Sequence, residues 1–189
     1  MNPPALRYSA LKPGEFPAED RAEVAVMGRS NAGKSTLLNA LVGAKVARVS
    51  QDPGRTRRIN FFDLGEWYLV DLPGYGYAKV SQRSRIEFGQ AVDRYLATRS
   101  ALIAAILIQD VRRDLEEEEA MVVDWADQRN VLLVVVANKA DKLNQRERER
   151  RRRALESQYR RPIHLISAQK RQGLDPVREA IRGLGLPGI

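Results

Sequence analysis

A glycine-rich octapeptide near the start of the chain has the residue types and spacing that bind phosphate groups. The run Glu23–Met27 leads directly into Gly28-Arg29-Ser30-Asn31-Ala32-Gly33-Lys34-Ser35, and a helix-forming run starts at Thr36. This is the pattern G-x-x-x-x-G-K-[ST] between a strand and a helix, where backbone N–H groups and the helix N-terminus surround phosphate oxygens. Residues 28–36 are therefore predicted to bind nucleotide, with Lys34 on the β and γ phosphates and Ser35 on Mg²⁺. The alternative is a glycine-rich turn that only caps a helix.

A second motif distinguishes guanine from adenine. Asn138-Lys139-Ala140-Asp141 follows the apolar run Val131–Ala137, and open α/β sheets place ligand loops at the carboxyl ends of their strands. The two oxygens of Asp141 match the N1–H and N2 amino donors of guanine, whereas adenine has no donor at N1. Asn138 and Lys139 would brace this loop. A polar strand-to-helix loop is the alternative interpretation.

Three further segments complete a nucleotide site in sequence order. Asp71-Leu72-Pro73-Gly74 ends an apolar run, so that Asp71 would hold Mg²⁺ through water and the Gly74 N–H would reach the γ phosphate. Thr56 is the candidate for the second hydroxyl ligand of Mg²⁺. A backbone N–H within Ser167-Ala168-Gln169 would reach guanine O6. Lys34, Thr56 and Gly74 are thus the predicted catalytic residues.

The elements that must position these motifs alternate between short apolar runs and segments of helical period, which predicts an α/β fold with a mostly parallel sheet. The turn Leu64-Gly65-Glu66-Trp67 predicts an antiparallel hairpin at the edge of this sheet. Residues 1–21 are expected to be an extended lead and residues 22–189 one domain. The six expected strands are 23–27, 59–64, 67–72, 102–109, 131–137 and 163–166. The expected helices are 34–41, 85–98, 115–128, 145–159 and 174–184.

Composition excludes several classes of protein. The chain of 189 residues has no cysteine, so that disulfides, thiolate zinc sites, cysteine nucleophiles and prenylation are excluded. His164 is the only histidine and is interpreted as structural. The longest apolar runs fall far short of the roughly 20 residues that span a bilayer, and no signal peptide precedes them. We therefore expect a cytoplasmic monomer without stable membrane association.

Basic charge is concentrated in one segment. The net charge is +8, and Lys142–Arg161 contains nine basic and three acidic residues. Such a concentration favours a polyanionic partner through the release of counterions from phosphates. Residues 146–153 are predicted to lie on a helix, where contact with RNA and a merely solvated face are both open.

The motifs together resemble one family of GTPases. Their order is similar to that of the translation-factor-related GTPases. Their residues most resemble those of one family within that class, the EngB family, also called YihA or YsxC. The resemblance covers about Ala22 to Leu184, and it rests on the octapeptide, Pro53-Gly54-Arg55-Thr56, Asp110-Val111-Arg112 and the highly specific Asp71-Leu72-Pro73-Gly74-Tyr75-Gly76-Tyr77-Ala78. Family members often have threonine where this chain has Asn138. Asparagine at this position is closer to the consensus of GTPases in general.

The resemblance implies a single Ras-like GTPase domain that assists assembly of the bacterial large ribosomal subunit, with ribosomal RNA and proteins as partners. Normal cell growth and septum formation would depend on it. Tyr75 stands where Ras-type enzymes have the glutamine that orients water, which implies slow intrinsic hydrolysis. Asn31 stands where potassium-activated relatives place an ion ligand, so that K⁺ is a candidate second cofactor beside Mg²⁺.

One loop has a composition that suggests a contact surface, and two other classes of function are alternatives to a GTPase. Residues 73–85 interleave glycines, tyrosines and basic groups, and we expect GTP to order them for a partner, with the tyrosines exposed; a mobile surface loop is the alternative. A P-loop kinase for a small metabolite is disfavoured by Asn138–Asp141. A membrane-tethered signalling switch is disfavoured because the chain has no lipidation motif.

Overall fold

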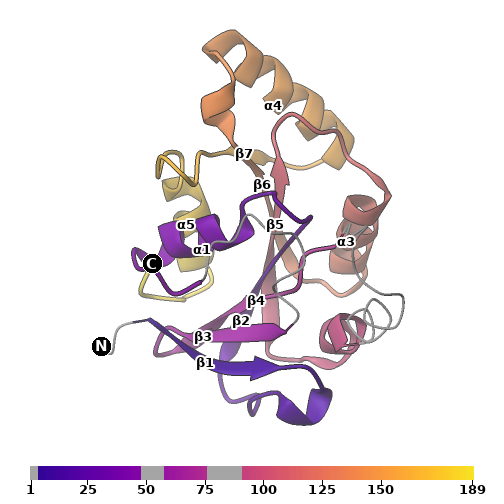
Figure 1. Ribbon diagram of the computed structural model, residues 1–189. Coiled ribbons are helices and arrows are strands. Elements are labelled where there is room, and N and C mark those ends of the chain that lie inside the picture. Colours follow the sequence, from indigo (N-terminus) through magenta and orange to yellow (C-terminus); the bar gives the residue numbers. More distant parts are fainter. Residues whose placement is uncertain (1–3, 48–57, 76–90) are drawn as a thin grey trace.

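The chain folds around one sheet of seven strands with helices on both faces (Figure 1). The computed structural model describes residues 4–47, 58–75 and 91–189. The strands are β1 (Ala5–Ala10), β2 (Ala22–Gly28), β3 (Ile59–Asp63), β4 (Trp67–Asp71), β5 (Leu102–Asp110), β6 (Leu132–Asn138) and β7 (Ile163–Leu165). The α-helices are α1 (Lys34–Val42), α3 (Glu117–Gln128), α4 (Gln145–Tyr159) and α5 (Asp175–Arg182), and residues 91–98 are also helical. Short 3₁₀ turns occupy η1 (Pro13–Glu15) and η2 (Ala140–Lys142).

Strand order brings the predicted motifs together at the carboxyl ends of the parallel strands. The order is β1-β3-β4-β2-β5-β6-β7. Strands β4, β2, β5, β6 and β7 run parallel, whereas β1 and β4 pair antiparallel with β3. The carboxyl ends of β2, β4, β5 and β6 therefore lie side by side, and open parallel sheets bind ligands at this edge.

The expectation of six strands was one too few. Residues 5–10, which we expected within an extended lead, form β1 and pair with β3 from Ala5↔Asp63 to Ala10↔Ile59. The β3–β4 hairpin is antiparallel as expected, but β1 covers it, so that the hairpin does not form the edge. The strand escaped prediction because four of its six side chains are exposed and it is held mainly by backbone pairing, which leaves no apolar pattern.

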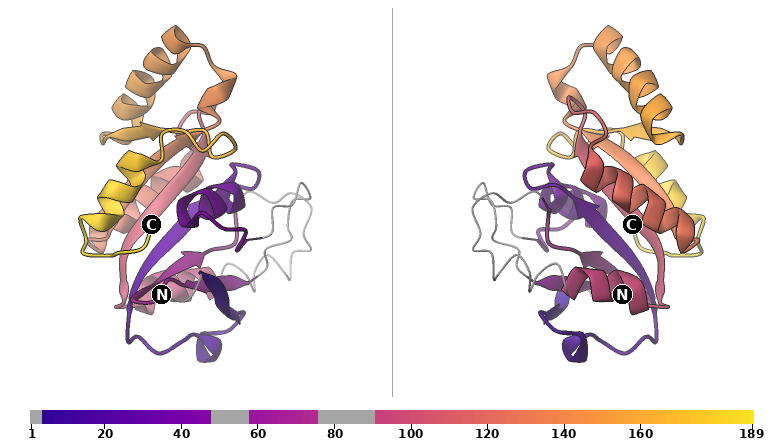
Figure 2. Two further views of the ribbon diagram at one scale, coloured as in Figure 1. Left: turned by 90° about the vertical axis from the view of Figure 1, so that its left-hand side faces the viewer. Right: turned by 90° about the vertical axis from the view of Figure 1, so that its right-hand side faces the viewer.

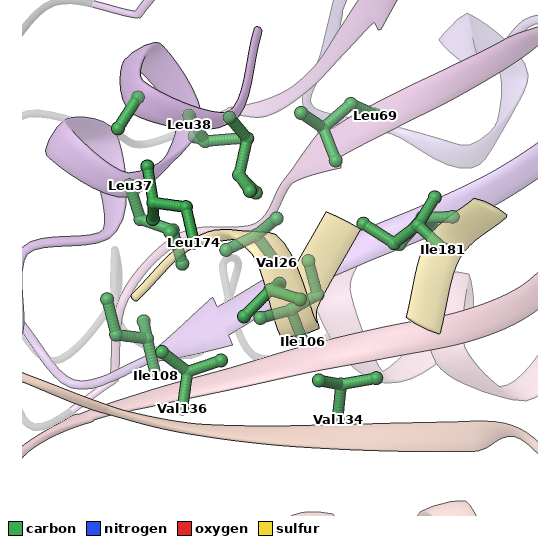
Figure 3. Close-up of a cluster of buried hydrophobic side chains, with 14 of the residues drawn as sticks. Val26, Leu37, Leu38, Leu69, Ile106, Ile108, Val134, Val136, Leu174 and Ile181 are labelled. Carbon is green, nitrogen blue, oxygen red and sulfur yellow. The ribbon is translucent and has the colours of Figure 1, made fainter. Parts of the chain in front are cut away.

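Two apolar cores lie on opposite faces of the sheet. The first packs α1 and α5 on the sheet, with Leu37 and Leu38 against Val26, Ile106 and Val136 (Figure 3). The second packs residues 91–98, α3 and α4 on the other face through side chains such as Tyr95, Ala126, Leu155 and Tyr159. Figure 2 shows α1 and α5 from one side and α3 from the other. Nearly all of β5 and β6 is buried, as sheets covered on both faces require.

The other expected elements agree closely with the structure. The bounds of α4 are those expected, and the remaining strands differ from the expected ranges by one residue at one or both ends. A capping box fixes the start of α4, because Asn144 accepts from the Glu147 N–H while Glu147 accepts from the Asn144 N–H. Helix α5 is shorter at both ends than expected. Of the helix expected at 85–98, only residues from 91 onward lie among those described.

A buried polar network joins residues 91–99 to β2. Glu23 is fully buried, and its carboxylate accepts hydrogen bonds from the Tyr95 hydroxyl at 2.8 Å and from Arg99. Arg99 also donates to the Pro17 carbonyl at 2.9 Å. Burial raises the pKa of Tyr95 well above its usual value, so that Tyr95 keeps its proton and donates. The network fixes the end of this helix against the central strand.

Replacing Glu23 is expected to destabilise the fold. In a Glu23→Ala variant Arg99, 6% exposed, loses its buried carboxylate partner and keeps the longer contact with Glu19 at 3.7 Å. Removing one member of a buried ion pair costs about 3–5 kcal/mol. Chemical denaturation should show this loss in the free energy of unfolding, while Glu66→Ala, at an exposed turn, should change it by no more than about 0.5 kcal/mol. Equal stability of the two variants would contradict the structural role of the network.

None of the described helices combines the length and the apolar character that a bilayer crossing needs.

Candidate functional site

The loop between β2 and α1 has a backbone that only glycine fits at two positions. A Cβ on Gly28 would lie 2.3 Å from the carbonyl oxygen of Ile108 in β5. Gly33 has φ +101°, and a Cβ there would lie 2.3 Å from the side-chain nitrogen of Asn138. Asn31 also has a positive φ of 64° and is exposed. The loop is thus pressed closely against β5 and β6, which fixes its shape before any phosphate binds.

Lys34, which is predicted to bind phosphate, forms an ion pair with a buried carboxylate. Lys34 begins α1 and its ammonium group pairs with Asp71, the last residue of β4, with side chains 8% and 3% exposed. Parallel pairing of β2 with β4 brings these residues together, since Val26 pairs with Asp71. Ser35 and Thr36 follow, half-buried, in the first turn of α1. A cation, a carboxylate and a hydroxyl therefore meet at one helix N-terminus.

The segment after β4 runs along the phosphate loop. The Ser30 N–H donates to the Tyr75 carbonyl at 3.0 Å, and Arg29 forms a parallel bridge with Tyr75. A Cβ on Gly74 would lie 3.1 Å from the Gly28 carbonyl oxygen and 3.2 Å from the Ser30 nitrogen. The backbone at Gly74 therefore lies so close to the phosphate loop that a side chain would press on that loop. Tyr75, which we expected to be exposed, instead packs on the second core with its hydroxyl buried.

Asn138 joins three loops. Its side-chain nitrogen donates to the Ala32 carbonyl at 2.9 Å, and its side-chain oxygen accepts from the Ala168 N–H at 2.9 Å. Lys139, with φ 66°, donates through Nζ to the Asn31 carbonyl at 2.8 Å. These contacts tie the end of β6 to the phosphate loop and to the loop after β7. The N-K-x-D segment therefore does more than connect a strand to a helix, as the bracing predicted for Asn138 and Lys139 requires.

Asp141 is held by the loop after β7. Its side chain is 6% exposed, and one carboxylate oxygen accepts from the Ser167 hydroxyl at 2.7 Å. This hydrogen bond lowers the pKa of Asp141 below its usual value, so that the group is ionised at neutral pH. The Ala168 and Ser167 N–H groups already donate to Asn138 and to Gln172. Within the described residues, Gln169 is the member of this triplet whose N–H has no protein acceptor.

Sequence reasoning gave no role to a charged cluster beside Lys139. Asp110 ends β5 and accepts from Arg112 at 2.9 and 2.7 Å and from Lys139 at 3.0 Å. Burial alone would raise the pKa of Asp110, but the hydrogen bonds from Arg112 and Lys139 outweigh burial and hold that pKa well below its usual value. Asp110 thus orients the lysine that supports Asn31. Its position at the carboxyl end of a parallel strand, next to the motif, is the feature that could have pointed to it.

Most of the predicted site residues meet at one edge of the sheet. The phosphate loop, Asp71, Gly74, Asn138 to Asp141 and Ser167 to Gln169 are connected by the contacts above. Thr56 and the whole of Asp52–Thr56 lie outside the described residues, as does Tyr77. A loop for phosphates and a loop for a base thus flank one end of a parallel sheet, which defines the class of P-loop proteins with a guanine-type base loop.

Comparison with known proteins agrees with this class. The family described as 50S ribosome-binding GTPase matches residues 23–139. A probable GTP-binding protein EngB of Desulfatibacillum aliphaticivorans is 40% identical over 93% of this chain and 88% of its own length. Its counterpart in Pelotomaculum thermopropionicum is 42% identical over 95% of this chain and 94% of its own length. The chain therefore belongs to the EngB family of GTP-binding proteins and is a GTPase.

Solved structures share the fold. The crystal structure of a probable GTP-binding protein engB has a TM-score of 0.71 at 21% identity, covering 86% of this chain and 98% of that one. Era of Aquifex aeolicus, crystallised with GDP and AlF₄⁻, has a TM-score of 0.72 at 24% identity, covering 89% of this chain and 57% of that one. The single α/β domain expected from the sequence is thereby confirmed.

Proposed function

We propose that this GTPase acts in the cytosol as a monomeric switch in assembly of the large ribosomal subunit, and that cell growth and septum formation depend on it through the supply of ribosomes. The arrangement that carries the nucleotide part is Asn138, which links the phosphate loop to the Ser167–Ala168 loop beside Asp141. The ribosomal part is supported by the family's description and by the basic charge of α4.

The residues in the site match the groups of Mg²⁺–GTP. Backbone N–H groups of residues 28–36 would surround the phosphates, with Lys34 on the β and γ groups and Gly74 beside the γ group. The Ser35 hydroxyl and the Asp71 carboxylate are oxygen donors of the kind Mg²⁺ prefers, Asp71 acting through water, and Thr56 would add a second hydroxyl. Bound Mg²⁺ would neutralise charge on the phosphates. Asp141 and the Gln169 N–H would read guanine.

Competition between nucleotides tests the base assignment. With Mg²⁺ present, GTP and GDP should displace a fluorescent guanosine nucleotide, whereas ATP at a thousandfold higher concentration should not. Equal displacement by ATP would instead favour the small-metabolite kinase.

Sedimentation tests the ribosomal partner. Purified protein with a non-hydrolysable GTP analogue should move with large subunits on a sucrose gradient, and with GDP it should stay at the top. Depletion from cells should lower the amount of mature large subunits before division septa are affected. Normal subunits after depletion would remove the proposal while leaving the GTPase assignment intact.

The arginines of α4 differ in whether they have partners within the protein, and those with partners form the first group. Arg148 donates to the carbonyls of Ala140 and Leu143, and Arg151 donates to the Val111 carbonyl and pairs with Asp114 at 2.9 Å. These two arginines therefore hold α4 against the base loop and against the loop after β5. Glu149 pairs with both Arg152 and Arg153, at 2.9 and 2.8 Å.

The second group has no such partners. Arg146 and Arg150 are exposed, lie one helical turn apart and form no ion pair within the described part of the chain. Together with Arg153, 75% exposed, they line one hollow on the helix surface. The unpaired guanidinium groups of Arg146 and Arg150 form a row that suits a phosphate backbone, since their charge has no internal counterpart to displace, whereas Arg153 also pairs with Glu149. We propose that this row contacts ribosomal RNA.

Charge reversal of the row tests this contact. A variant with Arg146→Glu and Arg150→Glu should bind large subunits more weakly, and the slope of log affinity against log salt should fall by about 2, since each phosphate contact contributes about one. The matched control reverses Arg129, directly after α3, and Arg182, at the end of α5, two exposed arginines whose loss changes net charge equally. GTP turnover without ribosomes should be unchanged in both. Identical salt slopes would identify the row as a solvated face.

A comparison of monovalent cations tests Asn31. We propose that the exposed Asn31 side chain helps to bind K⁺ beside the phosphates, a position in which a cation stabilises charge as an arginine finger does. Turnover of GTP should then be faster in KCl than in NaCl, and an Asn31→Ala variant should lose the difference. Equal rates in the two salts would remove K⁺ from the mechanism.

A further inference from the structure

Glu119 is a buried acidic residue whose role is not evident from its contacts. It lies in the first turns of α3 and is 1% exposed, yet neither of its carboxylate oxygens has a hydrogen-bond partner within the described residues. Its sequence neighbours Glu116 and Glu118 behave differently, because both pair with Arg29 of the phosphate loop, at 2.5 and 2.9 Å. Acidic residues at the start of a helix ordinarily complement the helix dipole from an exposed position, which the buried Glu119 does not have. A buried, unpaired carboxylate is costly and needs a reason.

The surroundings of Glu119 supply that reason. It borders a cavity of about 130 Å³ between α3 and the phosphate loop, which is also lined by Arg29, Ser30 and Gln109. The Tyr75 hydroxyl is likewise buried without a partner. Burial and the nearby Glu119 carboxylate both raise the pKa of Tyr75, so that Tyr75 keeps its proton and has a hydrogen bond to give.

Neighbouring groups leave Glu119 as the acceptor. Gln109 is engaged through its oxygen, which accepts from the Tyr159 hydroxyl at 2.6 Å, and its free nitrogen is itself a donor. An amide nitrogen and a phenol cannot satisfy each other as two donors, whereas a carboxylate can accept from both. The Tyr75 hydroxyl is thus a donor, and the Glu119 carboxyl group an acceptor, that both lack a partner among the described residues.

The backbone of Tyr75 connects this pair to the phosphate site. The Tyr75 carbonyl accepts from the Ser30 N–H at 3.0 Å, and the preceding Gly74 lies against Gly28 and Ser30. Gly74 is also the residue whose N–H would sense the γ phosphate. Any force that holds the Tyr75 side chain against the second core therefore holds Gly74 against the phosphate loop.

We propose that Glu119 is a positioning residue for GTP hydrolysis: a hydrogen bond that forms during turnover between its carboxyl group and the Tyr75 hydroxyl, neither of which has a partner among the described residues, fixes Gly74 where the γ phosphate will lie. The salt bridges of Arg29 to Glu116 and Glu118 hold the start of α3 to the same loop. Tyr75 thereby has a use that differs from the water-orienting role of glutamine in Ras-type enzymes: it anchors the sensor. The inference rests on GTPase activity alone and is independent of the ribosomal partner.

A double-mutant cycle on the full chain tests the pair. Turnover of GTP should fall about tenfold in Glu119→Ala and equally in Tyr75→Phe, the loss expected from one hydrogen bond to a charged group, and the double variant should lose no more than either single one. Glu119→Gln, whose amide oxygen still accepts, should recover most of the rate. Affinity for GDP, which lacks the γ phosphate, should stay unchanged in all four variants.

The control variant is Glu117→Gln, an exposed acid of the same helix turn, which should leave turnover unchanged. Losses that multiply in the double variant would show that the two side chains act separately and would overturn the proposal. So would wild-type turnover in Tyr75→Phe. A parallel fall in GDP affinity and in melting temperature would assign Glu119 a purely structural role, which also overturns it.

Discussion

An Asp141→Asn variant is expected to lose affinity for GTP by a factor of about 10²–10⁴ and to gain affinity for xanthosine triphosphate. The Asp141 carboxylate would accept from both N1–H and the N2 amino group of guanine, and hydrogen bonds to a charged group contribute about 1.5–3 kcal/mol each. Asparagine has one acceptor oxygen and turns an N–H toward the amino group of guanine. Xanthine carries a carbonyl at that carbon, which the new N–H can meet.

Displacement of a fluorescent guanosine nucleotide by GTP, by xanthosine triphosphate and by ATP measures this exchange. The lowered pKa of Asp141 means that the carboxylate protonates only below its usual value of 3.8, so GTP affinity of the wild-type chain should not titrate between pH 5 and pH 8 through this group. Asp175→Asn, at an exposed carboxylate on α5, is the matched control. If Asp141→Asn bound GTP as well as the wild-type chain does, the base would lie elsewhere.

The parts that could be predicted from sequence are those in which local pattern and tertiary role coincide. The phosphate loop was found because its chemistry requires fixed residue types at fixed spacing, and Gly28 and Gly33 contact backbone or side chain where a Cβ would clash. Strands β5 and β6 were found because burial on both faces leaves unbroken apolar runs. Helix α4 has the bounds expected from its sequence, and in the structure a capping box fixes its start.

The parts that could not be predicted depend on pairs of residues distant in sequence. Strand β1 is defined by its backbone pairing with β3, which no side-chain pattern in residues 5–10 records. Tyr75 looks like a loop residue until α3 is placed over it. The basic run of α4 carries one charge pattern in the sequence, yet Arg151 reaches Asp114 while Arg150, beside it, reaches no described partner. Which arginines are free is decided by packing.

The base loop shows the same division. The residue types of Asn138–Asp141 predict guanine recognition from donor and acceptor matching alone. That Asn138 ties two other loops together, and that the Ala168 N–H is spent on it, follows only from the geometry of β6 beside β7. Of the three N–H groups in Ser167–Gln169, we therefore propose that of Gln169 for guanine O6.

A Lys34→Ala variant is expected to lose both turnover and stability. Removing the cation that would meet the β and γ phosphates should lower kcat by about 10²–10³, the usual effect of deleting one electrostatic contact to a transition state. The same change strands Asp71, whose side chain is 3% exposed, without its ion-pair partner, at a cost of about 3–5 kcal/mol in the free energy of unfolding. Single-turnover kinetics and chemical denaturation measure the two losses.

Adding Asp71→Asn to this variant separates them. Asparagine removes the stranded charge, so the double variant should regain most of the lost stability, because a neutral amide is far cheaper to bury than a lone carboxylate. Turnover should stay low, since the cation is still missing and the Mg²⁺ ligand is weakened. A double variant that recovered both properties would mean that Lys34 serves only to neutralise Asp71. Recovery of stability alone means that the buried pair supports the fold while the same lysine serves the phosphates.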